Sequence, residues 1–322
     1  MRGAKKLIQI IQPIRSSKTA APIHVITGPT ATGKTALGLR LAQALDGEII
    51  SADSRQIYKE LTIGSAKPTV NELAQAPHHF VNELNLGEPY SAGLFAEQAS
   101  VRIDEVLARD RVPIVVGGST LYLHALVHGL SPAVPSDPVV RTNIEKRLEE
   151  FGKKALYEEL SKIDPQSAST MDPTKTSRLI RALEVFELTG TPLSKFHGQP
   201  PPPPHEFCVT VLTLERPTLY QRIEKRVDLM LEAGLIEENR RIRDLQLDRT
   251  LPALKSIGYQ EPLVYLDGHC SWHGMVELIK RNSRRYAKRQ LTWLRRYKAY
   301  RRIYAQTPTD KLLETILTSP QQ

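Results

Sequence analysis

One short glycine-containing stretch near the start of the chain restricts the possible folds more than any other feature. Residues 28–35 read Gly-Pro-Thr-Ala-Thr-Gly-Lys-Thr and fit the pattern G-x-x-x-x-G-K-S/T. An apolar run at 24–27 precedes them, and leucines at 37, 41 and 45 follow at the spacing of a helix packed on a sheet. This order predicts a strand, a phosphate-binding loop and the first turn of a helix.

The parts of this loop have separate predicted roles. Lys34 places a positive charge beside the phosphates, and the Thr35 hydroxyl is the predicted ligand of an Mg²⁺ ion. The predicted phosphate-binding residues are Gly28, Pro29, Thr30, Ala31, Thr32, Gly33, Lys34 and Thr35. The pattern alone leaves open whether the phosphates belong to a nucleotide.

Further strands are predicted at 47–54, 79–81, 112–118 and 207–214, which are apolar or rich in β-branched residues. Helical spacing separates several of them, and unbroken apolar runs that alternate with helices are typical of a parallel sheet covered on both faces. We therefore predict an α/β fold: a P-loop NTPase-like parallel sheet with an inserted small helical domain. From Tyr220 onward the chain is predicted to be helical.

Composition divides the chain into parts. Residues 1–21 are basic without acids, and are predicted to be a disordered extension, with an organellar transit segment as the alternative. Residues 22–130 and 206–322 are predicted to form the core. The charged segment 131–205 is the predicted inserted domain. It ends in the proline run 200–204, which favours an extended spacer, with an SH3 or WW ligand as the alternative.

Charge and hydropathy limit the class of protein. The 322 residues carry a formal net charge of +9, which indicates a polyanionic partner. No apolar run approaches the roughly 20 residues that span a bilayer. Cys208 and Cys270 stand far apart, so neither a disulfide framework nor a cysteine zinc site is predicted. We expect a soluble, cytoplasmic protein without a membrane partner.

The positive charge is concentrated near the C-terminus. Between Glu277 and Asp310 lysines and arginines are frequent and no acid occurs. Such a helix repels itself unless a polyanion such as RNA offsets the charge. Its aromatic residues recur at helical spacing and are predicted to pack rather than to stack on bases. A membrane-surface helix is the alternative.

The ends of two predicted strands carry further candidate groups, because open α/β sheets bind ligands there. Asp53 closes one strand, and Gly-Gly-Ser-Thr at 117–120 closes another. Asp53 can bind Mg²⁺ or face an acceptor group beside the phosphates, and a cap of the next turn is its structural alternative. Arg222 and Arg226 share a helical face that can bind an anion. His78 and His79 are interpreted as structural.

Six blocks, in this order, resemble the MiaA-type tRNA dimethylallyltransferase family. They are residues 28–35, 51–58, 63–68, 116–122, 181–185 and 287–294. The resemblance implies transfer of the dimethylallyl group from dimethylallyl diphosphate to N6 of adenosine-37 in tRNAs that read codons beginning with U, with Mg²⁺. It makes Asp53 the general base, and it assigns stabilisation of the diphosphate to Thr30, Lys34, Thr35 and Arg226.

The resemblance and the basic segment together give candidate contacts to tRNA. They are Asp53, Ser54, Arg55, Gln56, Ser119, Arg141, Ser177, Arg178, Arg181, Lys255, Gly258, Tyr259, Arg284, Arg285 and Arg289. The inserted domain is implied to clasp the anticodon stem-loop, and a monomer is expected. Ser119 stands where threonine is commoner in the family, which leaves the RNA contact there open.

Two other functions stay open. A P-loop small-molecule kinase or an adenylate isopentenyltransferase has the same fold, but little use for the cationic helix. A non-catalytic RNA-binding NTPase that uses the loop as a switch belongs to another class, and it would favour ATP or GTP over dimethylallyl diphosphate.

Overall fold

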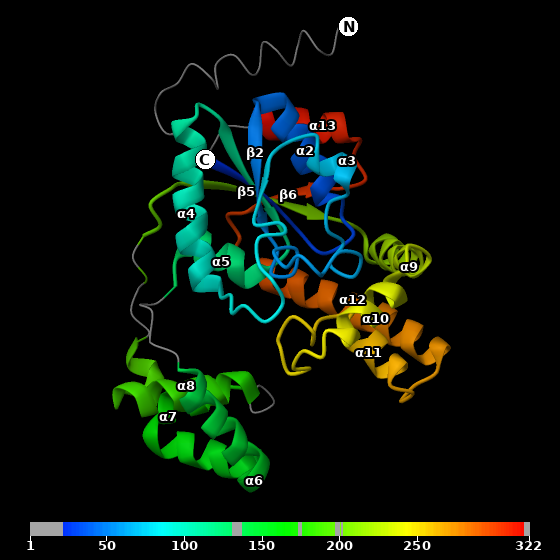
Figure 1. The fold of residues 1–322 in the computed structure, drawn as a ribbon. Helices are drawn as coiled ribbons and strands as arrows, with labels where there is room; N and C mark the ends of the chain where they lie inside the picture. Colours follow the sequence, from blue (N-terminus) through cyan, green and yellow to red (C-terminus); the bar gives the residue numbers. More distant parts are fainter. Residues whose placement is uncertain (1–21, 131–136, 173–175, 197–199, 201, 319–322) are drawn as a thin grey trace, which may run out of the picture. The chain divides into compact units, whose positions relative to one another are not determined.

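The computed structural model describes residues 22–130, 137–172, 176–196, 200 and 202–318 (Figure 1). The chain forms two compact units. The first comprises the described parts of 1–127 and 203–322, and the second those of 128–202. The extension predicted at 1–21 lies outside the described residues. In the described part of the chain, no helix is long and apolar enough to cross a membrane.

The first unit is built on one six-stranded sheet with the order β3-β2-β4-β1-β5-β6. All neighbouring strands run parallel, with Ile26 of β1 beside Val116 of β4 and Thr210 of β5. The strands are β1 (Ile23–Thr27), β2 (Gly47–Ala52), β3 (His78–His79), β4 (Val112–Gly117), β5 (Phe207–Thr213) and β6 (Arg301–Tyr304). The predicted parallel α/β sheet is confirmed.

Helices cover both faces of this sheet (Figure 1). The helices on the two faces are α2 (Lys34–Leu45), α4 (Ala92–Ala108), α5 (Thr120–His128) and α13 (Thr309–Thr318), and the other helices of this unit are α3 (Val70–Leu73), α9 (Arg216–Glu232), α10 (Leu235–Asp244), α11 (Gln260–Leu266) and α12 (Trp272–Leu294). Ile49 of β2 packs with α2 and α13, whereas its neighbour Ile50 packs with α4 and α5. Both faces of a strand are therefore buried, which explains the unbroken apolar runs.

The prediction of helix throughout from Tyr220 onward is wrong at β6. Arg301–Tyr304 pairs with β5, and the Arg301 guanidinium donates a hydrogen bond to Thr210 Oγ1 at 3.0 Å. Two adjacent arginines hide the apolar alternation by which a strand is predicted, so only pairing with β5 makes this segment a strand.

The second unit is helical. Its elements are α6 (Pro138–Ile163), α7 (Pro165–Thr170), α8 (Thr176–Thr189) and the 3₁₀ helix η1 (Leu193–Phe196). Asp137 caps α6 by accepting the Val139 N–H, and Asp164 caps α7 by accepting the Ser167 N–H. Apolar residues of α6, α7 and α8 form a small separate core.

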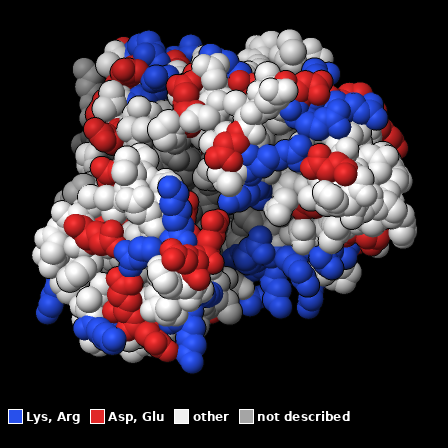
Figure 2. Space-filling model, turned by 60° about the horizontal axis from the view of Figure 1, so that its bottom comes forward, with Lys and Arg blue, Asp and Glu red and all other residues white. Residues whose placement is uncertain are grey.

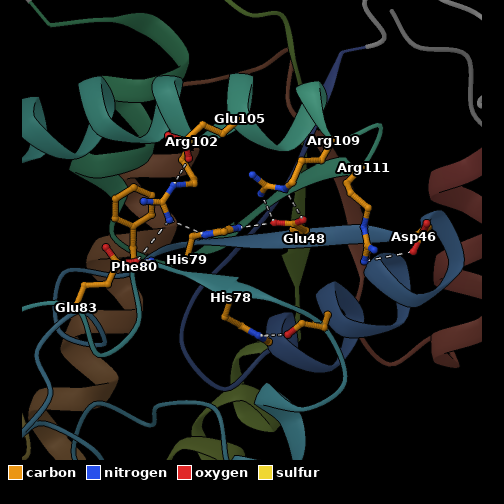
Figure 3. Close-up of polar contacts among 11 residues, drawn as sticks. Asp46, Glu48, His78, His79, Phe80, Glu83, Arg102, Glu105, Arg109 and Arg111 are labelled. Atoms are coloured by element: carbon orange, nitrogen blue, oxygen red, sulfur yellow. Dashed lines mark hydrogen bonds and ion pairs between the residues drawn. The ribbon is translucent and has the colours of Figure 1, made fainter.

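Hydrogen bonds and ion pairs between polar side chains connect the two-residue edge strand β3 to β2 and α4 (Figure 3). Buried Glu48 accepts hydrogen bonds from His79 Nε2 at 2.7 Å and Arg109 Nη2 at 2.8 Å. Arg102 Nη1 lies 2.7 Å from His79 Nδ1, and since arginine only donates, the histidine proton sits on Nε2. Burial acts to raise the pKa of Glu48, but these hydrogen bonds outweigh it and hold the pKa below its usual value.

Glu48→Gln is expected to lower the free energy of unfolding by about 1–3 kcal/mol near pH 7, because Arg109 and His79 lose a charged acceptor. The depressed pKa means that this contribution is present above the ordinary pKa of 4.5 and is lost as pH falls through the folded value. Urea unfolding at about pH 7 and about pH 3 should therefore show a gap to the wild type that shrinks with acidification. The control is Glu105→Gln, at an exposed ion pair with Arg102. An equal gap at both pH values would contradict the assignment.

Candidate active site

The carboxyl ends of β1, β2 and β4 meet at a cavity of about 390 Å³ within the first unit. Residues 28–35 follow β1, residues 53–56 follow β2, and residues 118–119 follow β4. Helices α9 and α12 and the segments 64–68 and 255–258 supply most of the remaining walls. One cavity thus collects segments that lie far apart in the sequence.

Local geometry builds the phosphate loop. Gly28 has a φ of 145°, and a Cβ atom there would lie 2.5 Å from the carbonyl oxygen of Leu212, so only glycine fits beside β5. Thr32 Oγ1 and Lys34 Nζ both donate hydrogen bonds to the Pro29 carbonyl oxygen, each at 2.8 Å. These bonds close the loop over the start of α2.

Two half-buried basic side chains lie beside this loop. Burial, followed by the charge of Arg226, lowers the pKa of Lys34 to about 7, and the Asp53 carboxylate acts in the opposite direction. Burial also lowers the pKa of Arg226. Their hydrogen-bond acceptors are neutral: the Pro29 carbonyl for Lys34, and Thr30 Oγ1 at 3.3 Å for Arg226. Two half-buried basic side chains with neutral partners form a site for a multiply charged anion.

Asp53 lines the same cavity. Its Oδ1 accepts the backbone N–H of Arg55 at 2.9 Å and, more weakly, that of Gln56 at 3.4 Å. This is the turn-capping role that was the structural alternative for Asp53. Because both bonds go to one oxygen, Oδ2 stays available to a ligand. The adjacent Ser54 N–H donates to Ser119 Oγ at 2.9 Å, which ties the ends of β2 and β4 together.

Two buried charged residues that the sequence reasoning missed hold the loop after Asp53. Glu238 of α10 accepts the backbone N–H of Ile63 at 2.7 Å and the Tyr259 hydroxyl at 2.8 Å. The Lys67 ammonium binds two backbone carbonyls and the Asn82 side chain, and burial lowers its pKa to about 8. The partner of Glu238 lies 175 residues away, so no local pattern identifies this contact.

Two side chains predicted to contact tRNA bind other residues of the protein. Tyr259 has no exposed surface, and its hydroxyl lies between Glu238 and the Ser65 N–H. Arg284 is paired with Glu224 of α9 at 2.5 Å. Tyr259 therefore supports the loop at 63–65 from inside, whereas Arg284, whose side chain is 26% exposed, joins α12 to α9. Tyr259 was predicted from a motif position and Arg284 from a run of basic residues. Neither feature indicates how exposed a side chain is.

Most other candidates in the first unit line the cavity. They are Thr30, Lys34, Thr35, Asp53, Ser54, Arg55, Gln56, Ser119, Arg226, Lys255, Gly258 and Arg289. Tyr286 of α12, predicted only to pack, lines it as well; burial, followed by the charge of Asp53, raises its pKa to about 12. Arg222, on the same helix as Arg226, is exposed and does not line the cavity.

The remaining candidates belong to the second unit. Arg181 Nη1 lies 2.9 Å, and Arg141 Nη1 3.8 Å, from a carboxylate oxygen of Glu184, which is almost fully buried. Ser177 and Arg178 are exposed on α8. The buried Glu184 carboxylate thus orients two of the four residues of this unit that are predicted to contact tRNA.

Helix α12 carries two sets of cations. Lys280 and Arg284 form ion pairs with acids of α9. The others are exposed, and none has an ion pair among the described residues: Arg281, Arg285, Lys288 and Arg289. Figure 2 shows that Lys and Arg side chains gather in groups on one face of the molecule. A helix face of this charge suits a polyanion.

Comparison with known proteins identifies close relatives. A model of the IPP transferase family matches residues 56–297. A tRNA dimethylallyltransferase of Salinibacter ruber is 50% identical over 310 residues, 95% of this chain and 95% of the relative. Another, of Chlorobium chlorochromatii, is 45% identical over 299 residues, 91% of this chain and 96% of the relative.

Solved structures are similar over most of the chain as well. A tRNA isopentenylpyrophosphate transferase from Bacillus halodurans matches with a TM-score of 0.68 and 38% identity, over 92% of this chain and 94% of that one. A eukaryotic dimethylallyltransferase acting on tRNA matches with a TM-score of 0.74 and 28% identity, over 88% of this chain and 73% of that one. These likenesses agree with the P-loop sheet and with Lys34, Arg226 and Asp53 in one cavity: the chain belongs to the IPP transferase family.

Proposed function

We propose that this protein transfers the dimethylallyl group of dimethylallyl diphosphate to N6 of adenosine-37 in tRNAs that read codons beginning with U. The relatives support tRNA as the substrate. The observation that carries the proposal is the pair of half-buried basic side chains, Lys34 and Arg226, that shares one cavity with Asp53. This arrangement suits a diphosphate bound next to an amine that must lose a proton.

The P-loop end of the cavity binds the leaving group. The bond between the allylic carbon and the bridging oxygen breaks, and its electron pair goes to the diphosphate, where negative charge grows. Lys34, Arg226 and the N–H groups at the start of α2 stabilise this charge as it develops. Thr30 holds the Arg226 guanidinium through its hydroxyl. Cations already in place gain interaction energy in the transition state, which raises the rate.

Asp53 acts on the acceptor. N6 of the adenosine forms a bond to the allylic carbon, and the proton that N6 loses goes to Asp53 Oδ2. The backbone bonds to Oδ1 hold the carboxylate in one orientation. The adenine has to leave its stack to reach the cavity, and an already unpaired loop lowers the cost of that step.

We propose Mg²⁺ as the cofactor. Thr35 lines the cavity, and Mg²⁺ bound with phosphates usually takes few ligands from the protein. Thr35 would hold the ion, which neutralises charge on the diphosphate. Asp53 is the one carboxylate among the described residues that line the cavity, which favours this sparse coordination over an all-protein cage.

We also propose that the second unit clasps the anticodon stem-loop. Arg141 and Arg181, oriented by Glu184, and exposed Ser177 and Arg178 are the residues that would contact its phosphates. All groups assigned to the chemistry lie in one cavity of one chain, so the proposal includes action as a monomer in the cytoplasm, where tRNA is found.

Incubation with labelled dimethylallyl diphosphate, Mg²⁺ and unmodified tRNA, followed by nucleoside analysis, tests the proposal. Label is expected in N6-dimethylallyladenosine. Transfer to free AMP would instead support the adenylate isopentenyltransferase. Tighter binding of ATP or GTP than of dimethylallyl diphosphate, without transfer, would support the NTPase switch.

The double variant Arg285→Ala/Arg289→Ala is expected to weaken tRNA binding and to flatten its salt dependence. Each lost phosphate contact removes about 0.7–0.9 from the slope of log K against log salt concentration. Filter binding over a salt series measures this slope. The control is Arg40→Ala/Arg249→Ala, which removes two exposed arginines paired with Asp310 and Asp267. Equal slopes in the two double variants would mean that α12 has no special contact with RNA.

A further inference from the structure

The amide of Gln290 joins three segments at the back of the active site. Gln290, on α12, is 3% exposed. Its Oε1 accepts the backbone N–H of Thr30 at 3.0 Å, and its Nε2 donates to the carbonyl oxygen of Gly118 at 2.8 Å. The partners lie in the P-loop and at the end of β4. Both ends of one side chain are therefore occupied by backbone groups that border the diphosphate site.

This contact decides which P-loop donors are available to a phosphate. Pro29 has no N–H, and the N–H of Thr30 is taken by Gln290. The N–H groups left to face an anion therefore begin at Ala31 and continue into α2. The same contact orients Thr30, whose hydroxyl accepts a hydrogen bond from Arg226.

Neither glutamate nor methionine can replace the Gln290 amide at this position. A Cβ atom at Gly118 would lie 2.8 Å from Gln290 Nε2, so glycine leaves the space that the amide fills. The site needs an acceptor for one backbone N–H and a donor to one backbone carbonyl, at the same side-chain length. Glutamate lacks the donor and methionine lacks both, while each has nearly the size of glutamine.

We propose that Gln290 is a positioning residue for the leaving-group site: it holds Thr30, and through Thr30 the Arg226 guanidinium, in the place where the diphosphate leaves. It also fixes the P-loop to α12, the helix whose exposed Arg285 and Arg289 are assigned to tRNA. One amide thereby links the two substrate sites. This inference rests on the proposed function, which assigns diphosphate to one site and tRNA to the other.

Gln290→Met is expected to weaken the binding of inorganic diphosphate, measured by calorimetry, about tenfold, because the P-loop loses its anchor. Turnover should fall by about 10²-fold or less, as expected for a misplaced group. The dissociation constant for tRNA should stay within about twofold, because no residue of the exposed α12 face is changed. Unaltered diphosphate binding and turnover in a folded variant would overturn the proposal.

A double-mutant cycle separates this role from mere support of the fold. If Gln290 acts through Thr30, then Gln290→Met and Thr30→Val remove the same placement of Arg226, and the double variant should bind diphosphate about as weakly as the worse single variant. Additive effects would show that Gln290 does not act through Thr30.

A measurement on the unaltered protein keeps the test decisive if Gln290→Met fails to fold. The Thr30 amide is expected to be protected from hydrogen exchange without any ligand, because Gln290 already binds it. Rapid exchange of this amide in the folded protein would overturn the proposal. Diphosphate binding and amide protection need no transfer reaction, so failure of the proposed activity would be seen separately.

Discussion

Asp53→Ala is expected to lower turnover at least about a hundredfold, the usual cost of a lost general base, and to leave tRNA binding nearly unchanged. The exocyclic amine of adenine is a poor nucleophile, and Asp53 is the one carboxylate that the cavity offers within the described chain. Single-turnover transfer with saturating tRNA and donor measures the chemical step, and filter binding measures the affinity for tRNA.

Two further variants sharpen this result. Asp53→Asn retains the capping bonds that Oδ1 accepts from the Arg55 and Gln56 N–H groups but cannot take a proton, so it should be as slow as Asp53→Ala without loss of stability. Asp244→Asn, at an exposed position of α10, is the control and should turn over normally. Wild-type turnover in Asp53→Asn would leave Asp53 only its structural role.

Lys34→Met is expected to lower turnover by about 10²–10³-fold, the typical cost of removing one charge-stabilising donor. Lys34 is half-buried beside Arg226, and its removal takes away one of the two positive charges assigned to the departing diphosphate. The Michaelis constant for the donor should also rise, because the ground-state diphosphate loses the same contact. Lys288→Met, an exposed cation of α12, is the matched control. Equal turnover in the two variants would remove Lys34 from the mechanism.

The depressed pKa of Lys34 adds a pH signature. In the free protein its pKa is about 7, so the ammonium loses its proton as pH rises above that value. A bound diphosphate favours the charged form and raises this pKa, so binding at about pH 8 should take up close to one proton, and affinity should fall with rising pH. Calorimetry of diphosphate in buffers of different ionisation enthalpy measures the uptake. The uptake should vanish in Lys34→Met, and persistence there would assign it to another group.

The parts of the fold that could be predicted from sequence are those with local signals. The P-loop needs glycine at position 28 because a Cβ atom there would lie 2.5 Å from the carbonyl oxygen of Leu212 in β5. The strands β1, β2 and β4 are buried on both faces, which forces an unbroken apolar run. Strand β6 could not be predicted, because its residues are charged and pairing with β5 alone makes it a strand.

The residues of the candidate site also fall into those with a local sequence signal and those without one. The sequence by itself determined the P-loop, Asp53 at a strand end and the cationic C-terminal segment, since each depends on residue type and near neighbours. Only the tertiary structure decided that Tyr259 is buried beside the site, that Arg284 pairs with Glu224, and that Glu238 and Gln290 belong to the site. Gln290 meets Thr30 across 260 residues. A hydrogen bond over that separation depends on how α12 packs beside the sheet, and no pattern within either segment records it.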